Sequence, residues 1–542
     1  MNRHYRLPGI ALLIAVLVVG GVGSAARAGG LNDIVNKLPD PCAETKHDAA
    51  IPNAFEVDGF EGVSYAPDLE GRPLSETTPV ILLRHGLGHT YLDYDYLLEH
   101  LARQGFIAAS VEGTIVSLAG HLDYLKSHYG LNADVPIGLI GHSRGGEFVI
   151  DFATLNEQAG APHNIRSVLG LAPSDRDRGS LSPFVASSYF VILGSHDEDT
   201  AGWNDAQGNG PPSEIQPKSG TAGFGSYDRA GNEVVFDGDI ALEPRMTRSM
   251  LFVHGANHNY WREFGGLPPF LPHFIDVDAH HAILKGYAAG WFLWQLDGDD
   301  AYKGMFQGSW KPKSLSLHLT TRPDDWGQPA GLPLRMFTQY SAKNRRVIRH
   351  FQGAASTDDQ NGVVSSGGAS HLLHHHSPHD TGAVRVRWTG DEDLQYVAFT
   401  VPDKAAFVGG NAKNVSSFTS LNFRVGQIYD ATCDSTGRPP CEGLNPFLQD
   451  QDFYVILEDD DGEIGFVRAS DFGVIPFPAR FLYDGNPQQP GGDYSKSAMN
   501  TIRVPLSSIG RGIDLTRVNR IIFQFFRGTT GDVLIDSIEF EH

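Results

Sequence analysis

Residues 139–147 read LIGHSRGGE, and this stretch decides the fold of the first half of the chain. An apolar run at 135–140 leads into Ser143, which stands between glycines in the pattern G-x-S-x-G. The pattern is typical of a sharp turn from a strand into a helix, which exposes a serine hydroxyl at the end of a sheet. Because the chain contains 62 glycines, the pattern also arises by chance. Its meaning depends on the residues around it.

Strand-like and helix-like segments alternate on both sides of this turn. Apolar runs typical of buried strands occur at 80–83, 106–111, 135–140, 168–171, 189–193 and 250–254. Apolar residues at helical spacing occur at 91–104, 118–129, 147–155 and 280–296. This alternation predicts an α/β fold in which helices cover both faces of a doubly wound, mostly parallel sheet.

A nucleophilic serine requires a general base and an acid that orients the base. Two further residues fit these roles. Asp197 stands in GSHDED just after one predicted strand, and His258 stands in GANHN just after another. The chain order serine, acid, histidine is the order expected with this kind of turn. We therefore expect Ser143 to be the nucleophile, His258 the base and Asp197 the orienting acid, with Asp199 as the alternative acid.

A tetrahedral oxyanion needs two backbone N–H donors. One is expected from Arg144, the residue after the nucleophile. The other is expected from Leu87 in the loop HGLG at 85–88, with Gly88 as the alternative.

The sequence resembles the α/β-hydrolase superfamily, most closely its cutinase-type polyesterase, dienelactone hydrolase and chlorophyllase branch. The motifs that carry this resemblance are GHSRGG, the HG loop, LGSHD and GANH. The resemblance spans about residues 60–305. It implies hydrolysis of carboxylic esters without a metal or a cofactor in catalysis. Arg144 departs from the polyesterase pattern, so the substrate range of polyesterases is not implied.

A Gly/Pro-rich segment at 201–226, with Trp203 and Phe224 and followed by Tyr227, separates the acid from the histidine. Two interpretations stay open, a loop that shapes the substrate site and a surface insertion.

The pattern changes after about residue 310. Short alternating runs at 383–388, 421–425, 453–457, 501–504, 520–525 and 533–540 predict an all-β domain over 344–542. Residues 311–343 are polar and contain four prolines, so we expect them to be a linker. The run at 502–540 resembles the end of a jelly roll of the galactose-binding-like kind found in carbohydrate-binding modules. The resemblance implies binding to a polysaccharide or polymer surface, and a structural calcium ion with Asp536 as a candidate ligand.

Three other features of the second half have two interpretations each. The acidic run 458–461 is a calcium loop or a hairpin turn, and the five histidines within 371–379 are a metal site or an exposed loop. Trp388 and Tyr454 stack on sugars or pack in the sheet. A resemblance of fold alone does not decide between these functions.

The N-terminus carries a basic head, an apolar run at 10–19 and the small residues ARA at 26–28. This pattern predicts a signal peptide over 1–28, followed by a catalytic domain over 29–310, so the mature protein is expected to be exported, either secreted or periplasmic. No later segment has the roughly 20 apolar residues of a membrane span. The mature chain would carry 39 basic and 64 acidic residues, a net charge of −25, which disfavours binding to nucleic acid.

An exported protein can oxidise Cys433 and Cys441, which enclose a short turn-rich loop. Cys42 is left free or pairs between molecules. Together these observations predict a secreted serine esterase. A polyester- or polysaccharide-de-esterifying enzyme anchored by its β-sandwich and a non-catalytic binding protein on a hydrolase fold are the alternatives.

Overall fold

The computed structural model describes residues 40–174, 188–197, 200, 222–230, 232–233, 243–244, 246–263, 275–318, 336–341, 345–349, 358–360, 364–368, 383–390, 395–403, 411–428, 445, 449–475, 477, 479–482, 493–496, 499–509 and 512–542. All of these belong to one compact unit, Asp40–His542. The expected signal peptide lies outside the described residues.

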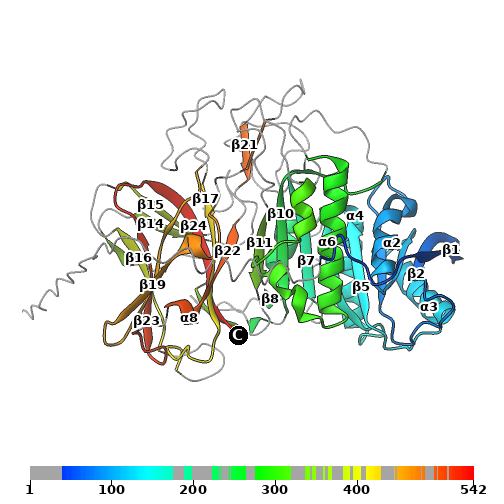
Figure 1. Cartoon of the computed structure of the whole chain (residues 1–542), viewed down its shortest axis with the longest axis horizontal. Helices are drawn as coiled ribbons and strands as arrows, with labels where there is room; N and C mark the ends of the chain where they lie inside the picture. The colour runs from blue at the N-terminus through cyan, green and yellow to red at the C-terminus, as the bar shows by residue number, and fades with distance from the viewer. Residues whose placement is uncertain are drawn as a thin grey trace, which may run out of the picture. The chain divides into compact units, whose positions relative to one another are not determined.

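Nine strands of the first half form one mixed sheet in the order β1-β2-β4-β3-β5-β6-β7-β10-β11 (Figure 1). The pairs from β4 through β3, β5, β6 and β7 to β10 are parallel, and the pairs β1–β2, β2–β4 and β10–β11 are antiparallel. The bounds are β1 Ala50–Val57, β2 Phe60–Pro67, β3 Val80–Arg84, β4 Ile107–Val111, β5 Ile137–His142, β6 Ile165–Leu171, β7 Ser188–His196, β10 Arg248–Asn257 and β11 Met336–Ser341. The expected parallel strands are present, and antiparallel strands extend the sheet at both edges.

Helices cover both faces of this sheet, because its central strands are apolar on both sides. In β3, Ile81 and Leu83 pack with the helices of one face, and Val80 and Leu82 pack with those of the other. The first face carries α2 and α6, and the second carries α3, α4 and α5. Their bounds are α2 Asp95–Arg103, α3 Ser117–Tyr129, α4 Arg144–Gln158, α5 Ala222–Arg229 and α6 Val277–Gln295, and the 3-10 turn η1, Tyr91–Tyr94, precedes α2.

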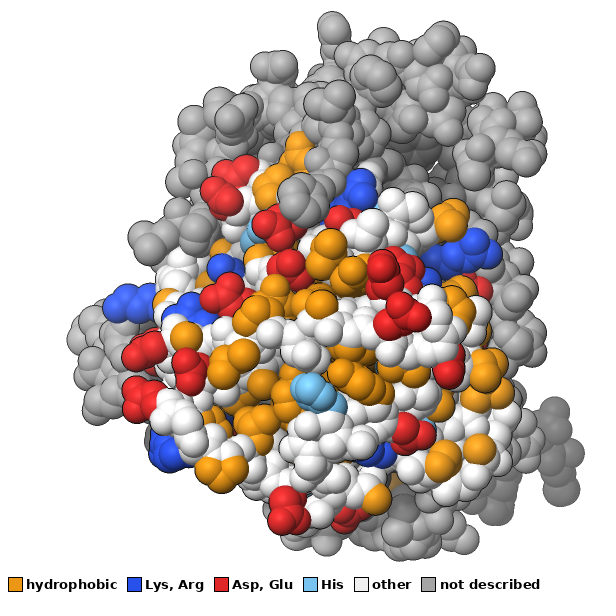
Figure 2. Space-filling view, turned by 90° about the vertical axis from the view of Figure 1, so that its right-hand side faces the viewer, with side chains coloured by type: hydrophobic (Ala, Val, Ile, Leu, Met, Phe, Trp, Pro, Cys, Tyr) orange, Lys and Arg blue, Asp and Glu red, His pale blue; other side chains and the backbone are white. Residues whose placement is uncertain are grey.

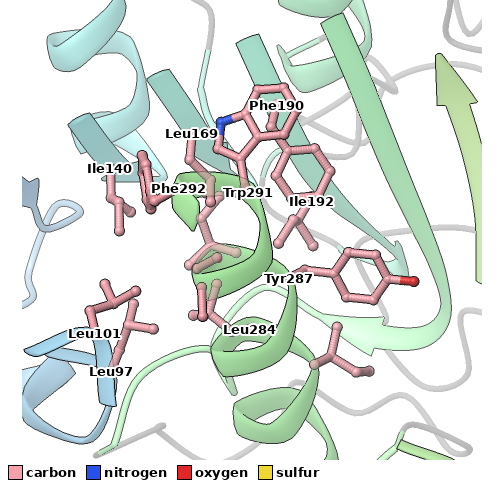
Figure 3. Packing of buried hydrophobic residues seen from close by; sticks show 14 of the residues in the cluster. Leu97, Leu101, Ile140, Leu169, Phe190, Ile192, Leu284, Tyr287, Trp291 and Phe292 are labelled. Carbon is pink, nitrogen blue, oxygen red and sulfur yellow. The ribbon is translucent and has the colours of Figure 1, made fainter. Parts of the chain in front are cut away.

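Aromatic rings hold α6 against the sheet (Figure 3). Trp291 of α6 lies beside Phe190 of β7, with ring centroids 5.2 Å apart. The indole N–H of Trp291 donates to the hydroxyl of Ser167 on β6 (2.6 Å). A buried indole thus packs and has its polar atom satisfied, which fixes the helix on the strands.

Charged side chains are scattered on the face of the molecule shown in Figure 2. Acidic groups are interspersed with apolar and uncharged ones, and the lysine and arginine side chains of the described residues form no continuous patch on this face.

The second half is a sandwich of two antiparallel sheets. One has the order β14-β15-β24-β17-β22, with β12 also paired to β24, and the other has the order β13-β16-β23-β18-β19. The bounds are β12 Arg345–Arg349, β13 Asp358–Gln360, β14 Val364–Gly368, β15 Ala383–Trp388, β16 Tyr396–Thr400, β17 Ser420–Gln427, β18 Phe453–Asp459, β19 Ile464–Arg468, β22 Asn500–Pro505, β23 Val518–Phe525 and β24 Gly531–Glu541. The rings of Phe423 and Phe453 pack on Phe523 at 4.8 and 5.5 Å between the sheets.

Strand β11 lies within 311–343, which the sequence had suggested as a linker. Its six residues are all buried, and the N–H groups that point away from β10 are accepted by side chains of β22. Thr338 N–H donates to Asn500 Oδ1 (3.3 Å), and Tyr340 N–H donates to Thr501 Oγ1 (3.1 Å). The stretch MFTQYS has no regular alternation of apolar and polar residues, so the sequence did not indicate this strand against a proline-rich background.

Arg424 and Asp536 form a buried ion pair on neighbouring strands β17 and β24, with side-chain exposures of 2% and 0%. Arg424 also donates to Gln339 Oε1 on β11 (3.1 Å). Shorter elements are β8 Asn232–Glu233, β9 Glu243–Pro244, η3 Asp300–Tyr302, α7 Lys303–Phe306, η4 Lys313–His318, η6 Ala469–Asp471, β20 Ala479–Leu482, β21 Asp493–Lys496 and α8 Leu506–Ile509.

Candidate active site

Ser143 lies at the turn between β5 and α4, and its backbone is strained. Its φ and ψ are 55° and −123°, a combination that residues with a side chain seldom adopt. The Ser143 N–H donates to the carbonyl of Leu171, and its own carbonyl accepts from the N–H groups of Gly146 and Ser174, each at 2.9 Å. Three backbone hydrogen bonds therefore hold a turn that would relax without them.

Two glycines make room for this turn. A Cβ atom on Gly141 would lie 2.2 Å from the carbonyl oxygen of Gly145, and a Cβ atom on Gly145 would lie 2.0 Å from that of Arg84. Both contacts are with backbone, so only glycine lets α4 approach β5 and β3 this closely. The G-x-S-x-G pattern thus reflects close packing at Ser143.

His258 and Asp197 form a buried hydrogen-bonded pair. Asp197 follows β7 and His258 follows β10, and these strands are parallel neighbours with Asn257 opposite His196. His258 Nδ1 lies 3.0 Å from Asp197 Oδ2, and the two residues are 1% and 2% exposed. Little water competes for this bond, so it is stronger than the same bond at the surface. The structure brings together the residues predicted as base and orienting acid.

Thr200 also holds Asp197, a contact that the sequence reasoning missed. Its N–H donates to Asp197 Oδ1 (2.8 Å), and its hydroxyl lies 3.0 Å from Asp197 Oδ2 and 3.1 Å from the carbonyl oxygen of Ala172. The available signal was the spacing Asp-x-x-Thr, typical of a turn in which a carboxylate accepts an N–H nearby in the chain. The alternative acid Asp199 lies outside the described residues.

The loop that carries His258 rests on neighbouring polar groups. Asn257 Oδ1 accepts the N–H groups of Asn259 and Tyr260, both at 2.9 Å, and the Asn257 N–H donates to His280 Nε2 at 3.0 Å. His280 Nδ1 lies 2.8 Å from a backbone carbonyl oxygen at the start of α6, so Nδ1 carries the proton. Burial lowers the pKa of His280 to about 3, so the ring stays a neutral acceptor.

The expected oxyanion donors lie in two segments beside Ser143. Arg144 begins α4, and the first N–H groups of a helix have no partner within it and favour negative charge. The turn after β3 approaches from the other side, because a Cβ atom on Gly86 would lie 2.9 Å from the Cβ atom of Ser143. Leu87 and the alternative Gly88 both stand in this turn.

His85 ties this turn to the neighbouring strand end. Its ring nitrogens lie 2.8 Å from the carbonyl oxygen of Gly86 and 2.7 Å from the carboxylate of Glu112, which follows β4. The His85 ring therefore ties the backbone just before Leu87 to the residue that follows β4.

Two aromatic residues of the segment for which a substrate loop and a surface insertion were both open belong to the core. Phe224 and Tyr227 lie in α5 and are 3% and 0% exposed. The ring of Phe224 packs on Phe252 of β10 at 5.8 Å, so neither the substrate-loop nor the surface-insertion interpretation holds for this pair. Trp203 lies outside the described residues. His254 lies within β10, with its ring packed 4.9 Å from that of Phe337.

The two aromatic candidates of the sandwich differ in burial. Trp388 is fully buried and stacks on Phe525 with centroids 4.1 Å apart, so it is part of the sheet core. Tyr454 is partly buried and meets Phe466 and Phe526 edge-on at 5.5 and 4.9 Å.

The acidic run 458–461 lies at the hairpin between β18 and β19. The carboxylate of Asp459 accepts three backbone N–H groups, and these bonds lower its pKa. The other three carboxylates pair with Arg520, Lys413 and Arg517 at 2.6, 2.9 and 2.5 Å. Each acidic group thus has a protein partner, which favours the hairpin-turn interpretation over a calcium loop.

Asp536 has the guanidinium of Arg424 as its partner. Within the described ranges, no group of three or more His, Cys, Asp or Glu side chains is arranged to hold a metal ion. The calcium expectation stays a prediction, and the histidines of 371–379 lie outside these ranges.

Of the three cysteines, only Cys42 lies within the described residues, and there it is a free thiol. It donates to the carbonyl oxygen of Ala282 (3.3 Å), and burial raises its pKa. The expected pair Cys433 and Cys441 lies outside the described residues.

Within the described part of the chain, no helix combines the length and the apolar character needed to cross a bilayer.

No protein-family model matches the sequence, and no curated protein matches it. Solved structures with partial similarity include esterases and carbohydrate-binding modules. The ferulic acid esterase of Streptomyces cinnamoneus is 14% identical over 46% of this chain and 89% of its own, with a TM-score of 0.29. An esterase of Pyrobaculum calidifontis is 14% identical over 31% of this chain and 70% of its own (TM-score 0.23). The family 11 carbohydrate-binding module of a Clostridium thermocellum cellulase is 14% identical over 37% of this chain and 96% of its own (TM-score 0.21). At this level of similarity, function has to be argued from the geometry of the site.

Proposed function

We propose that this chain is a serine hydrolase that cleaves carboxylic esters, with an α/β-hydrolase fold in its first half. The observation that carries the proposal is the buried 3.0 Å bond between His258 Nδ1 and Asp197 Oδ2, at the same sheet edge as the strained turn of Ser143. The strand order around β3 and β5 supports the fold assignment. A buried histidine–carboxylate pair at the loop ends of parallel strands is an arrangement suited to proton transfer.

In the proposed reaction, His258 Nε2 takes the proton of the Ser143 hydroxyl while Oγ attacks the ester carbonyl carbon. Because Nδ1–H donates to Asp197, the neutral ring carries its lone pair on Nε2. Collapse of the tetrahedral intermediate breaks the bond to the alcohol, which leaves with the proton from His258. Water then attacks the acyl-enzyme by the same route, releases the acid and restores Ser143.

The N–H groups of Leu87 and Arg144 would bind the oxyanion in both tetrahedral intermediates. One such donor is typically worth about 3 kcal/mol in the transition state. The close approach of the Gly86 backbone to Ser143 supports the assignment of the first donor to this turn.

We further infer that the protein is exported and that its β-sandwich binds a polysaccharide or polymer surface near the ester. The N-terminal pattern supports export, and the two-sheet architecture supports a binding module. Tethering a hydrolase to its substrate raises the local concentration of ester without any new catalytic contact.

The first test is hydrolysis of p-nitrophenyl acetate and p-nitrophenyl octanoate, together with labelling by a fluorophosphonate. The wild-type protein should hydrolyse an ester and be labelled once, with the label on Ser143 by mass spectrometry. Ser143→Ala should lose both properties, with a fall in kcat on the order of 10⁶. Ser127→Ala, a serine exposed on α3, is the matched control and should behave as wild type. Equal rates for wild type and Ser143→Ala would reject the proposal.

A further inference from the structure

A buried chain of hydrogen bonds connects three loops of the candidate site. Tyr94, at the end of η1, lies with its hydroxyl 3.1 Å from His89 Nδ1 and 2.7 Å from His142 Nδ1. His142 Nε2 lies 3.1 Å from the carbonyl oxygen of His258. Tyr94 and His142 are both 0% exposed. This series of hydrogen bonds thus begins in the segment that follows Leu87 and ends at the backbone of His258.

The rings in this chain also pack against one another. The His142 ring lies 5.0 Å from that of His89 and 4.9 Å from that of His258, between centroids. His142 is the last residue of β5 and directly precedes Ser143. The series of hydrogen bonds therefore runs from the expected oxyanion turn, past the nucleophile, to the base.

The direction of each hydrogen bond follows from chemistry. The carbonyl oxygen of His258 only accepts, so Nε2 of His142 must carry a proton. Burial lowers the pKa of His142 well below its ordinary value, so the ring is neutral and its Nδ1 accepts. The hydroxyl of Tyr94 must then donate to His142.

His89 adds the remaining bond. Burial lowers the pKa of His89 to about 3, so this ring also carries a single proton. Because the proton of Tyr94 is directed to His142, the oxygen of Tyr94 accepts from His89 Nδ1–H. All three hydrogen bonds run in one direction, and the hydroxyl of Tyr94 takes part in two of them.

We propose that Tyr94 and His142 are positioning residues that hold the backbone of His258 in place at the candidate site, with the hydroxyl of Tyr94 fixing the orientation of the His142 ring. The inference rests on the proposed function, because it assigns a role within that same site. Tyr94 and His142 are both 0% exposed, and they act through His258 and the turn of Leu87. Small displacements of a catalytic group cost large factors in rate, about 100-fold for 1 Å.

Tyr94→Phe keeps the packed ring and removes only the hydroxyl. Without it, Nδ1 of His142 loses the hydroxyl that orients the ring towards the carbonyl oxygen of His258. We expect kcat to fall about 10- to 100-fold, with KM changed less than about twofold, because the substrate site itself is intact. Tyr287→Phe is the matched control. Tyr287 is equally buried in the same core, its hydroxyl has no hydrogen-bond partner among the described residues, and its kcat should match wild type.

A second pair of variants separates the bond from the packing. His142→Gln extends an amide N–H towards the place of Nε2 and should keep most of kcat, whereas His142→Met fills similar space without a donor and should lose it. Fluorophosphonate titration counts the competent sites, so kcat is expressed per folded, reactive molecule.

The outcomes distinguish the two proposals. Wild-type protein that neither reacts with the fluorophosphonate nor hydrolyses any ester rejects the proposed function. Active wild type with an unchanged kcat for Tyr94→Phe rejects the positioning role alone. Equal losses in His142→Gln and His142→Met also reject it, because the hydrogen bond would then not be the cause. If Tyr94→Phe does not fold, the His142 pair decides the question.

Discussion

Replacing Ser143 by glycine should stabilise the fold while abolishing hydrolysis. The φ of 55° and ψ of −123° at this position cost a residue with a side chain about 1–3 kcal/mol. Glycine adopts these angles without a steric penalty, but it loses about 0.5–1 kcal/mol more conformational entropy on folding than alanine does. The difference predicts that Ser143→Gly unfolds with a free energy about 1 kcal/mol higher than Ser143→Ala.

The comparison with alanine isolates the backbone, because both variants lack the hydroxyl and only alanine keeps the Cβ atom. Urea unfolding followed by tryptophan fluorescence measures the difference, since Trp261 and Trp291 are fully buried and report loss of the core. Both variants should be inactive towards p-nitrophenyl esters. A Ser143→Gly protein that is no more stable than Ser143→Ala would refute the reasoning, because the turn would then store no strain.

Three further outcomes are expected. Thr200→Val removes a hydroxyl beside the Asp197 carboxylate. Because a hydrogen bond to a charged group is worth about 1.5–3 kcal/mol, steady-state kinetics should show kcat reduced about 10- to 100-fold with KM nearly constant. An unchanged kcat would contradict the role of Thr200. Arg424→Met removes the cation paired with the buried carboxylate of Asp536 and should lower the free energy of unfolding by about 3–5 kcal/mol in urea titrations. The double variant Arg424→Met with Asp536→Leu should recover most of this loss. A double variant that is equally unstable would show that charge is not the cause. Burial lowers the pKa of His100 from 6.5 to about 4. Between these pH values only the unfolded chain binds the proton, so the free energy of unfolding falls as the pH drops. His100→Gln should therefore reduce the loss of unfolding free energy between pH 7 and pH 5 by about 2 kcal/mol. Identical pH dependence in both proteins would place the acid sensitivity elsewhere.

The central sheet was predictable because its strands are buried on both faces. Continuous apolar runs such as β3 and β5 have few alternatives to a parallel strand between helices. The hairpin of β1 and β2 was missed because its alternation is weak, although Asp58 and Gly59 carried a signal. Both have positive φ values, 53° and 81°, and Asp-Gly is a preferred pair for a two-residue hairpin turn.

The main members of the candidate site were predictable for a related reason. The carboxyl ends of parallel strands meet at one edge, so residues that follow three strands are brought together however far apart they lie in the chain. Their supporting contacts were not predictable. Tyr94 meets His142 across 48 residues, and no periodicity or motif relates the two positions. Such contacts depend on side-chain packing, which sequence spacing alone does not reveal.

The way in which β11 ends the first sheet bears on how this protein can be divided. An edge strand with free N–H groups is a template for pairing with another chain, which leads to aggregation. Here the side chains of Asn500 and Thr501 accept the outward N–H groups of Thr338 and Tyr340. A fragment that stops short of β22 would expose that edge, so we expect truncation at the boundary between the halves to favour aggregation. The two halves should therefore be produced and engineered as one protein.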